Sequence, residues 1–128
     1  MTSVVFDASA VVAVLRDEPG ANTIAPFCGD GLLSAVNLQE AIKILRGRGF
    51  SAKGVAYMIE TLDLEIIPHN EIDAYQAAEL VQATQQFGSG LGDRTCMALA
   101  ISKGVPAITT DRAWAKLSIP GLDVILAR

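Results

Sequence analysis

The sequence predicts an α/β fold in which a parallel sheet is covered by helices on both faces. Short, strongly apolar runs alternate along the chain with longer segments of helical periodicity, which is the pattern of repeated β-α-β units. Acidic residues directly follow two of these apolar runs. Because 51% of the residues are hydrophobic and only 5% are aromatic, we also expect an ordered domain with an aliphatic core.

The predicted elements are bounded by recognisable breakers and caps. Pro19 and Gly20 end the first helix, Gly47 ends the third, and Ser51 is a suitable N-cap for the next. The glycine-rich segment 88–92 is expected to form a flexible loop before the last helix. The predicted strands are residues 3–6, 31–34, 65–68, 105–109 and 122–126. The predicted helices are residues 8–16, 21–28, 36–46, 52–62, 70–86 and 93–103.

Length and charge narrow the class of protein. The 128 residues predict a single domain, residues 1–128. A net charge of −4 argues against a general nucleic-acid coat protein but does not exclude a nuclease. No basic region precedes the first apolar run, so we expect no targeting segment, no membrane association and a cytoplasmic location. Cys28 and Cys96 lie in apolar surroundings and are expected to be buried free thiols in a reducing compartment.

Four acidic residues, Asp7, Glu40, Asp93 and Asp111, form the candidate site. Asp7 and Asp111 directly follow apolar runs, so both are expected at the carboxyl edge of a parallel sheet, where open α/β folds place their sites. Carboxylates that converge there repel one another unless a cation lies between them, and their oxygens favour Mg²⁺ or Mn²⁺. Such a site suits phosphodiester hydrolysis by metal-activated water.

Taken singly, each acid also has an ordinary structural explanation. Asp7, Asp93 and Asp111 each stand where a carboxylate could cap the helix that follows. Glu40 lies inside a helix, where it is either partly buried or paired with Lys43. The functional interpretation therefore depends on the joint placement of the four residues and on the sequence around them.

Four segments surround these acids in order. They are Val4-Val5-Phe6-Asp7-Ala8-Ser9-Ala10, Ser34-Ala35-Val36-Asn37-Leu38-Gln39-Glu40, Leu91-Gly92-Asp93-Arg94-Thr95-Cys96-Met97-Ala98-Leu99-Ala100 and Thr109-Thr110-Asp111-Arg112-Ala113-Trp114. Together they resemble the four motifs of the PIN domain family, and the third is closely similar to that of VapC-type toxins. The resemblance covers essentially the whole chain. The lead-in Gly88-Ser89-Gly90 is more glycine-rich than the family pattern, but this departure leaves the four acids intact.

The resemblance implies both a fold and an activity. The fold would be a PIN-like α/β/α sandwich with a five-stranded parallel sheet in the order 3-2-1-4-5. The protein would be the toxin of a type II toxin–antitoxin system, a homodimeric Mg²⁺- or Mn²⁺-dependent endoribonuclease that leaves a 5′-phosphate and is blocked by a cognate antitoxin. The residues carried over as catalytic acids and metal ligands would be Asp7, Glu40, Asp93 and Asp111, with Ser9 and Thr110 as supporting polar groups.

Our hypothesis for the site assigns the principal metal to Asp7 and Asp93, helped by Asp111, with Glu40 ligating or orienting water. Because four close carboxylates should keep at least one proton when no metal is bound, metal affinity should rise with pH. Cations elsewhere must hold the RNA. The densest basic cluster is Lys43, Arg46, Arg48 and Lys53, which otherwise is a solvated helix end and loop. Other candidate side chains are Arg94 and Arg112, as phosphate contacts or neutralising charges, and Trp114, as a buried anchor in preference to a base-stacking platform.

Other functions fit the residues less well. A haloacid-dehalogenase-like phosphatase needs a second acid two residues after the first, where Ser9 stands, and a phosphoacceptor receiver domain needs paired acids after its first strand. The strongest alternative is a non-catalytic PIN-like module that binds RNA or a partner. A PIN nuclease in RNA maturation, without an antitoxin, is the other.

Overall fold

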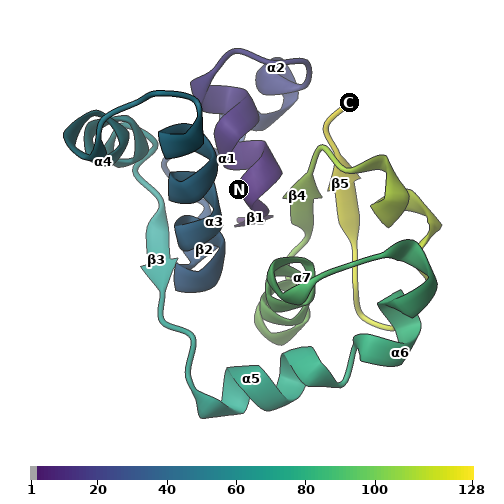
Figure 1. The fold of residues 1–128 in the computed structure, drawn as a ribbon. Coiled ribbons are helices and arrows are strands. Elements are labelled where there is room, and N and C mark those ends of the chain that lie inside the picture. The colour runs from purple at the N-terminus through teal and green to yellow at the C-terminus, as the bar shows by residue number, and fades with distance from the viewer. Residues whose placement is uncertain (1–2) are drawn as a thin grey trace.

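In a computed structural model, which describes residues 3–128, the strands form a single parallel five-stranded sheet (Figure 1). Its strand order is β3-β2-β1-β4-β5, which confirms the order that the family resemblance implied. All five predicted strands are present, each shorter than predicted by one or two residues. They are β1 (Val5–Phe6), β2 (Leu32–Ser34), β3 (Glu65–Ile67), β4 (Ala107–Thr109) and β5 (Val124–Leu126).

The sheet register brings the ends of the two central strands together. Phe6 in β1 pairs with Ile108 in β4. The next N–H along the chain, that of Asp7, donates to the carbonyl oxygen of Ile108 at 3.0 Å. Asp7 therefore leaves the sheet beside Thr109, at the carboxyl edge, as predicted from the sequence.

Helices and 3-10 turns connect the strands. The helices are α1 (Ala8–Leu15), α2 (Ala21–Ile24), α3 (Ala35–Gly47), α4 (Ala52–Glu60), α5 (Glu71–Ala78), α6 (Val81–Thr84) and α7 (Leu91–Lys103). The 3-10 turns are η1 (Ala25–Phe27), η2 (Gln85–Phe87) and η3 (Arg112–Lys116). Ser51 caps α4 as predicted, because its side chain accepts the N–H of Gly54 at 3.0 Å.

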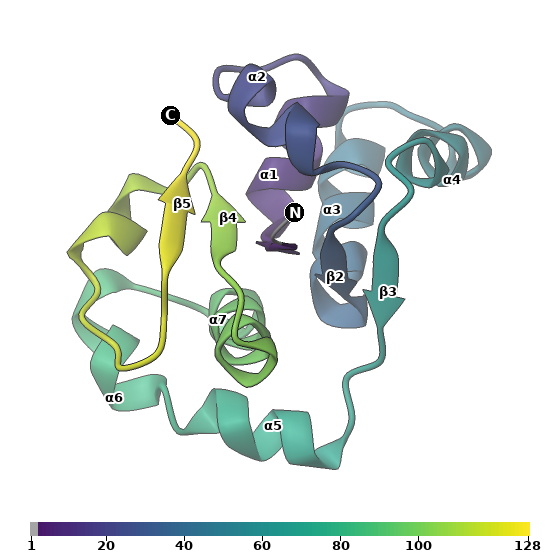
Figure 2. The ribbon, with the colours of Figure 1, turned by 180° about the vertical axis from the view of Figure 1, so that it is seen from behind.

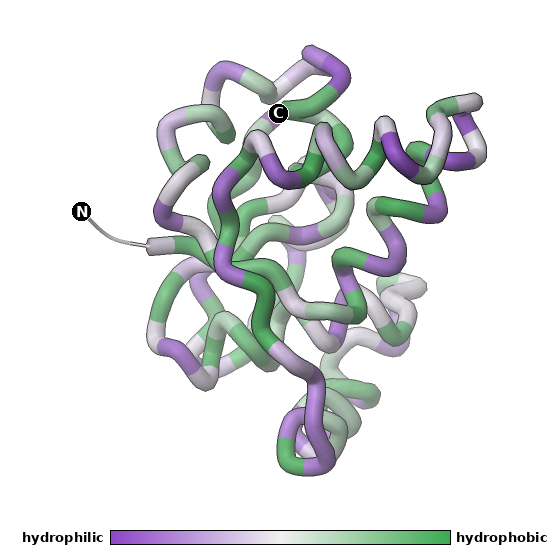
Figure 3. The backbone as a smooth tube through the Cα atoms, turned by 90° about the vertical axis from the view of Figure 1, so that its left-hand side faces the viewer, coloured by the Kyte–Doolittle hydropathy of each residue, from purple (hydrophilic) through white to green (hydrophobic). Residues whose placement is uncertain are grey.

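The sheet separates two hydrophobic clusters. Along β1, Val4 and Phe6 face a cluster built with α1, α3 and α4, whereas Val5 faces a cluster built with α7 and Trp114. Figure 2 shows these two groups of helices from behind, on opposite sides of the strands. In Figure 3, the segments that run through the middle of the molecule are coloured mostly as hydrophobic. Successive side chains of this strand point to opposite faces of the sheet, so helices can pack on both faces.

Two predicted helices differ from those in the structure. The predicted helix 70–86 is broken after α5 and continues as α6 and η2. Thr84 is fully buried near this break, and its hydroxyl donates to the carbonyl oxygen of Leu80 at 2.7 Å, a local bond of the kind that bends helices. In the segment 21–28, the helix tightens after Ile24 into a 3-10 turn that contains Pro26.

Both cysteines are free thiols, as predicted; Cys96 is buried and Cys28 is partly buried. Trp114 is also buried, so its expected role as an anchor is confirmed. Within residues 3–128, no helix has the length and apolar character needed to cross a bilayer.

Candidate functional site

The four predicted acids come from four different parts of the fold. Asp7 follows β1, Glu40 lies in α3, Asp93 lies in α7 and Asp111 follows β4. The helices α3 and α7 are in contact, so residues far apart in the sequence are brought together at the carboxyl edge of the sheet. The charges of Glu40 and Asp93 act on Asp7, and the charge of Asp111 acts on Asp93, so the carboxylates lie close to one another.

Asp7 occupies the N-cap position of α1, but its side chain does not cap the helix. Instead, its Oδ2 atom accepts hydrogen bonds from the hydroxyls of Ser9, at 2.7 Å, and Thr109, at 2.9 Å. The residue is only 5% exposed. Helix capping therefore does not explain this carboxylate.

The surroundings of Asp7 favour its protonated form. Burial raises the pKa of this carboxyl from 3.8 to about 6, against the lowering effect of the hydrogen bonds from Ser9 and Thr109. The negative charges of Asp93 and Glu40 raise its pKa further. Asp7 is thus within electrostatic reach of both Asp93 and Glu40.

Glu40 makes no ion pair with Lys43, contrary to one of the two interpretations of the sequence. Its Oε1 atom accepts a hydrogen bond of 2.8 Å from Nδ2 of Asn37, one helical turn earlier. The same Nδ2 atom donates to the carbonyl oxygen of Gly92 at 2.9 Å. Glu40 therefore lies against the start of α7, beside Asp93.

Asp93 is not the N-cap of its helix, because α7 begins two residues earlier than predicted. At the third helical position, its Oδ2 atom accepts the N–H of Gly90 at 3.1 Å. Burial raises the pKa of the Asp93 carboxyl; the Gly90 bond lowers it, the charge of Asp111 raises it and the charge of Arg94 lowers it. Asp93 thus links Asp111 electrostatically to the rest of the site.

Asp111 is the acid for which the capping explanation is confirmed. Its Oδ1 atom accepts the N–H of Ala113 at 3.0 Å, and it is the N-cap of η3. It is also exposed, unlike Asp7. Ser9 and Thr110 were expected as supporting polar groups. The Ser9 hydroxyl contacts Asp7, and the second hydroxyl on Asp7 comes from Thr109. Thr110 contributes its backbone N–H, which donates to Ser9 Oγ at 3.1 Å.

The chemistry of the acids fits a hard divalent cation, although their geometry is not that of a finished metal site. Among residues 3–128, no three Asp, Glu, His or Cys side chains are already arranged as metal ligands. The candidate ligand atoms are all carboxylate oxygens, and the charges of Glu40 and Asp93 that raise the pKa of Asp7 favour a bound cation.

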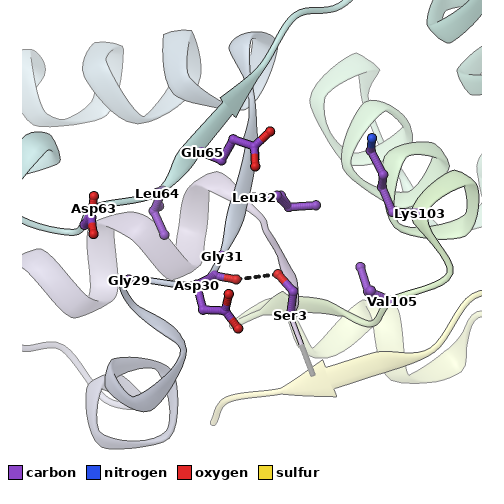
Figure 4. Close-up of a pocket in the computed structure, with 10 residues that line it drawn as sticks. All are labelled: Ser3, Gly29, Asp30, Gly31, Leu32, Asp63, Leu64, Glu65, Lys103 and Val105. Carbon is purple, nitrogen blue, oxygen red and sulfur yellow. Dashed lines mark hydrogen bonds between the residues drawn. The ribbon is translucent and has the colours of Figure 1, made fainter. Parts of the chain in front are cut away.

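Sequence reasoning missed Asn37, although its position three residues before Glu40 places both on one face of α3. It also missed Arg128, which lines a hollow of about 650 Å³ at the carboxyl edge with Pro19, Thr110, Asp111 and Arg112. Another hollow, of about 520 Å³, lies at the amino ends of the strands, away from the four acids (Figure 4). Asp30, Asp63 and Glu65 line it together with Lys103.

Comparisons with known proteins identify the family and the fold of the chain. The PIN domain family model matches residues 4–120. No curated protein matches the sequence. Among solved structures, the fold is similar to that of VapBC2 from Rickettsia felis bound to a DNA fragment from its promoter, with a TM-score of 0.72 and 16% identity over 97% of this chain and 98% of that chain.

Two further solved structures share the fold. A toxin–antitoxin complex from Klebsiella pneumoniae gives a TM-score of 0.73 and 17% identity over 98% of each chain. VapC20 from Mycobacterium tuberculosis, described as a Sarcin-Ricin loop cleaving toxin, gives 0.70 and 15% identity over 90% of this chain and 96% of that chain. These likenesses establish the fold, and the family match spans nearly the whole sequence. The chain belongs to the PIN domain family.

Proposed function

We propose that this protein is the toxin of a type II toxin–antitoxin system and acts as a Mg²⁺- or Mn²⁺-dependent endoribonuclease. Membership of the PIN domain family supports nuclease activity, and the fold shared with chains of toxin–antitoxin complexes supports the toxin role. The main support for the proposal is the environment of Asp7. Its carboxylate is buried and caps no helix, and the charges of Glu40 and Asp93 raise its pKa. Such an arrangement opposes folding, so it points to a site that binds a ligand.

In this proposal, Asp7, Asp93 and Asp111 would hold the metal ion, and Glu40 would ligate it or orient water. A bound Mg²⁺ or Mn²⁺ would supply the positive charge that makes water more acidic and stabilises the attacked phosphate. The hydroxyls of Ser9 and Thr109 both donate to Oδ2 of Asp7. Within residues 3–128, Oδ1 of Asp7 accepts no hydrogen bond, so it is available to a ligand.

The proposed partners are an RNA strand, a cognate antitoxin and a second copy of the chain. Arg112 and Arg128, in the hollow beside Asp111, are suited to hold RNA phosphates next to the acids. Ile72 and Tyr75 on α5 and Leu91 at the start of α7 are 68%, 69% and 77% exposed, which is unusual for large apolar side chains and supports burial against a protein partner. The antitoxin and the cytoplasmic location both follow from the toxin proposal.

RNA cleavage by the purified protein tests the proposal. The wild-type protein should cleave RNA with Mg²⁺ or Mn²⁺ and not with EDTA. Asp7→Asn and Asp93→Asn should each reduce kcat by roughly a hundredfold or more, the scale of loss when one electrostatic group is removed from an active site. Asp30→Asn, in the hollow at the amino edge, is the matched control and should keep full activity.

The opposite results are informative. A folded wild-type protein that binds Mn²⁺ but cleaves no cellular RNA would favour a non-catalytic PIN-like binding module. Metal-dependent cleavage by a protein whose gene has no antitoxin gene beside it would favour a nuclease of RNA maturation.

A further inference from the structure

Asn37 combines three features that packing alone does not explain. It is fully buried within α3. Its Nδ2 atom makes two hydrogen bonds, to Glu40 in its own helix and to the carbonyl oxygen of Gly92 in α7. Its Oδ1 atom is buried and has no hydrogen-bond partner within residues 3–128. A buried carbonyl oxygen without a partner destabilises the folded state.

A residue selected only to fill this space would be apolar. Ala41 and Leu45, further along the same helix, are fully buried and apolar. The carboxamide of Asn37 therefore contributes something other than volume. Both hydrogen bonds that the Asn37 amide donates end beside the acidic site, which indicates that the amide serves the site.

Gly92 completes the arrangement from the side of α7. A Cβ atom added to Gly92 would overlap the carboxylate of Glu40. The Glu40 carboxylate is thus held between the amide of Asn37 and the bare backbone of Gly92, directly before Asp93. With either neighbour changed, this carboxylate would take another direction.

We propose that Asn37 is a positioning residue of the acidic site. Its amide sets the direction of the Glu40 carboxylate and ties α3 to α7, so that Glu40 and Asp93 face the same point. This inference rests on the proposed function, because it assigns Asn37 a role in binding the metal ion through Glu40. It adds a residue to the site that is neither an acid nor a metal ligand.

Mn²⁺ binding, measured by isothermal titration calorimetry without RNA, tests this role. Asn37→Ala should weaken Mn²⁺ binding by about 10–100-fold, the range for the hydrogen-bond partners of metal ligands. In a Glu40→Gln background, the same substitution should have no further effect, because Asn37 acts through Glu40. Equal losses of affinity in the two backgrounds would overturn the proposal.

Asn37→Leu separates positioning from folding. Leucine keeps the branching of asparagine and removes the unpartnered Oδ1, but it is larger and leaves the carbonyl oxygen of Gly92 without its donor, so the melting temperature should fall. At a temperature where circular dichroism shows the variant to be folded, Mn²⁺ affinity should be lost by a similar factor as in Asn37→Ala. Thr84→Ala, at a buried hydroxyl outside the site, is the control and should leave Mn²⁺ affinity unchanged.

The outcomes also separate this inference from the proposed function. Wild-type binding that depends on Glu40 but is indifferent to both Asn37 variants would overturn only the role of Asn37. A wild-type protein that does not bind Mn²⁺ would overturn the proposed function and the role of Asn37 with it.

Discussion

Asp7 shows at the scale of one residue how a site can oppose folding. An exposed carboxyl loses its proton near pH 4, whereas burial raises the pKa of Asp7 to about 6. Between these values the folded chain keeps a proton that the unfolded chain has lost. The free energy of unfolding therefore falls as the pH rises through this window, and above it the penalty is about 3 kcal/mol.

Asp7→Asn should stabilise the metal-free protein at pH 8, because the amide carries no charge and still accepts the hydroxyls of Ser9 and Thr109. The expected gain in the free energy of unfolding is up to about 3 kcal/mol, and it should vanish near pH 4. Urea denaturation with EDTA at both pH values measures it. Equal stability of the two proteins at pH 8 would contradict the raised pKa, and Asp123→Asn, an exposed acid, serves as the control.

The local sequence predicted the positions of Asp7 and Asp111 better than those of their neighbours. Apolar runs before Asp7 and Asp111 placed both at the sheet edge, as observed. Thr110 was expected as a supporting polar group; the second hydroxyl on Asp7 comes from Thr109, and Thr110 contributes its backbone N–H to Ser9. Only the register of β1 and β4, which sets Phe6 beside Ile108, decides between adjacent threonines, and register depends on contacts across the sheet.

At the scale of elements, α3 and α7 meet at a point where a side chain on α7 would displace the Glu40 carboxylate. Gly92 is buried in the first turn of α7, and a Cβ atom there would overlap the Glu40 carboxylate. The glycine does not serve the helix itself, because alanine is favoured over glycine in a helix by about 1 kcal/mol. It serves the contact between the two helices.

Gly92→Ala should therefore weaken Mn²⁺ binding without unfolding the protein. We expect a loss of affinity of about tenfold or more, because the Glu40 carboxylate must move away from Asn37. Gly90→Ala is the matched control, since a Cβ atom there meets no atom within 4 Å. Calorimetric titration of both variants measures the difference, and unchanged affinity in Gly92→Ala would show that the position of this carboxylate is not important.

Helices bounded by clear caps or breakers were predicted well, and the helix without such boundaries was not. The N-cap at Ser51 and the breakers Pro19 and Gly20 placed α4 and α1 within two residues of their ends. The segment after Asn70 has no Gly or Pro before Gly88, so its break near Leu80 carries no local signal. Packing of Leu80 and burial of Thr84 decide that break.

For the whole molecule, the proposed RNA binding requires a chain with net charge −4 to gather cations at one place on its surface. The predicted basic cluster is exposed, but its Arg48 makes an ion pair of 2.6 Å with Glu18. Arg112 and Arg128 come from two different segments and line a hollow beside Asp111. We therefore expect these two arginines to contribute more to RNA binding than the cluster does.

Arg112→Gln and Arg128→Gln should each weaken RNA binding. The plot of log affinity against log salt should become shallower by about 0.7 for each RNA phosphate that the variant no longer neutralises. Fluorescence anisotropy with the non-cleaving Asp93→Asn protein measures both effects. Arg46→Gln, in the exposed cluster, is the comparison, and a larger effect there would assign RNA binding to the cluster instead.

Hydrophobic pattern and the residues beside strand ends were enough to predict the fold class, the strands and the family motifs, and to name four candidate acids. The folded structure was needed to show which hydroxyl contacts Asp7 and that Asn37 and Gly92 hold Glu40. The contacts of Asn37 with Gly92 and of Thr109 with Asp7 join residues 55 and 102 positions apart. Their geometry follows from sheet register and from the approach of two helices, which no local pattern encodes.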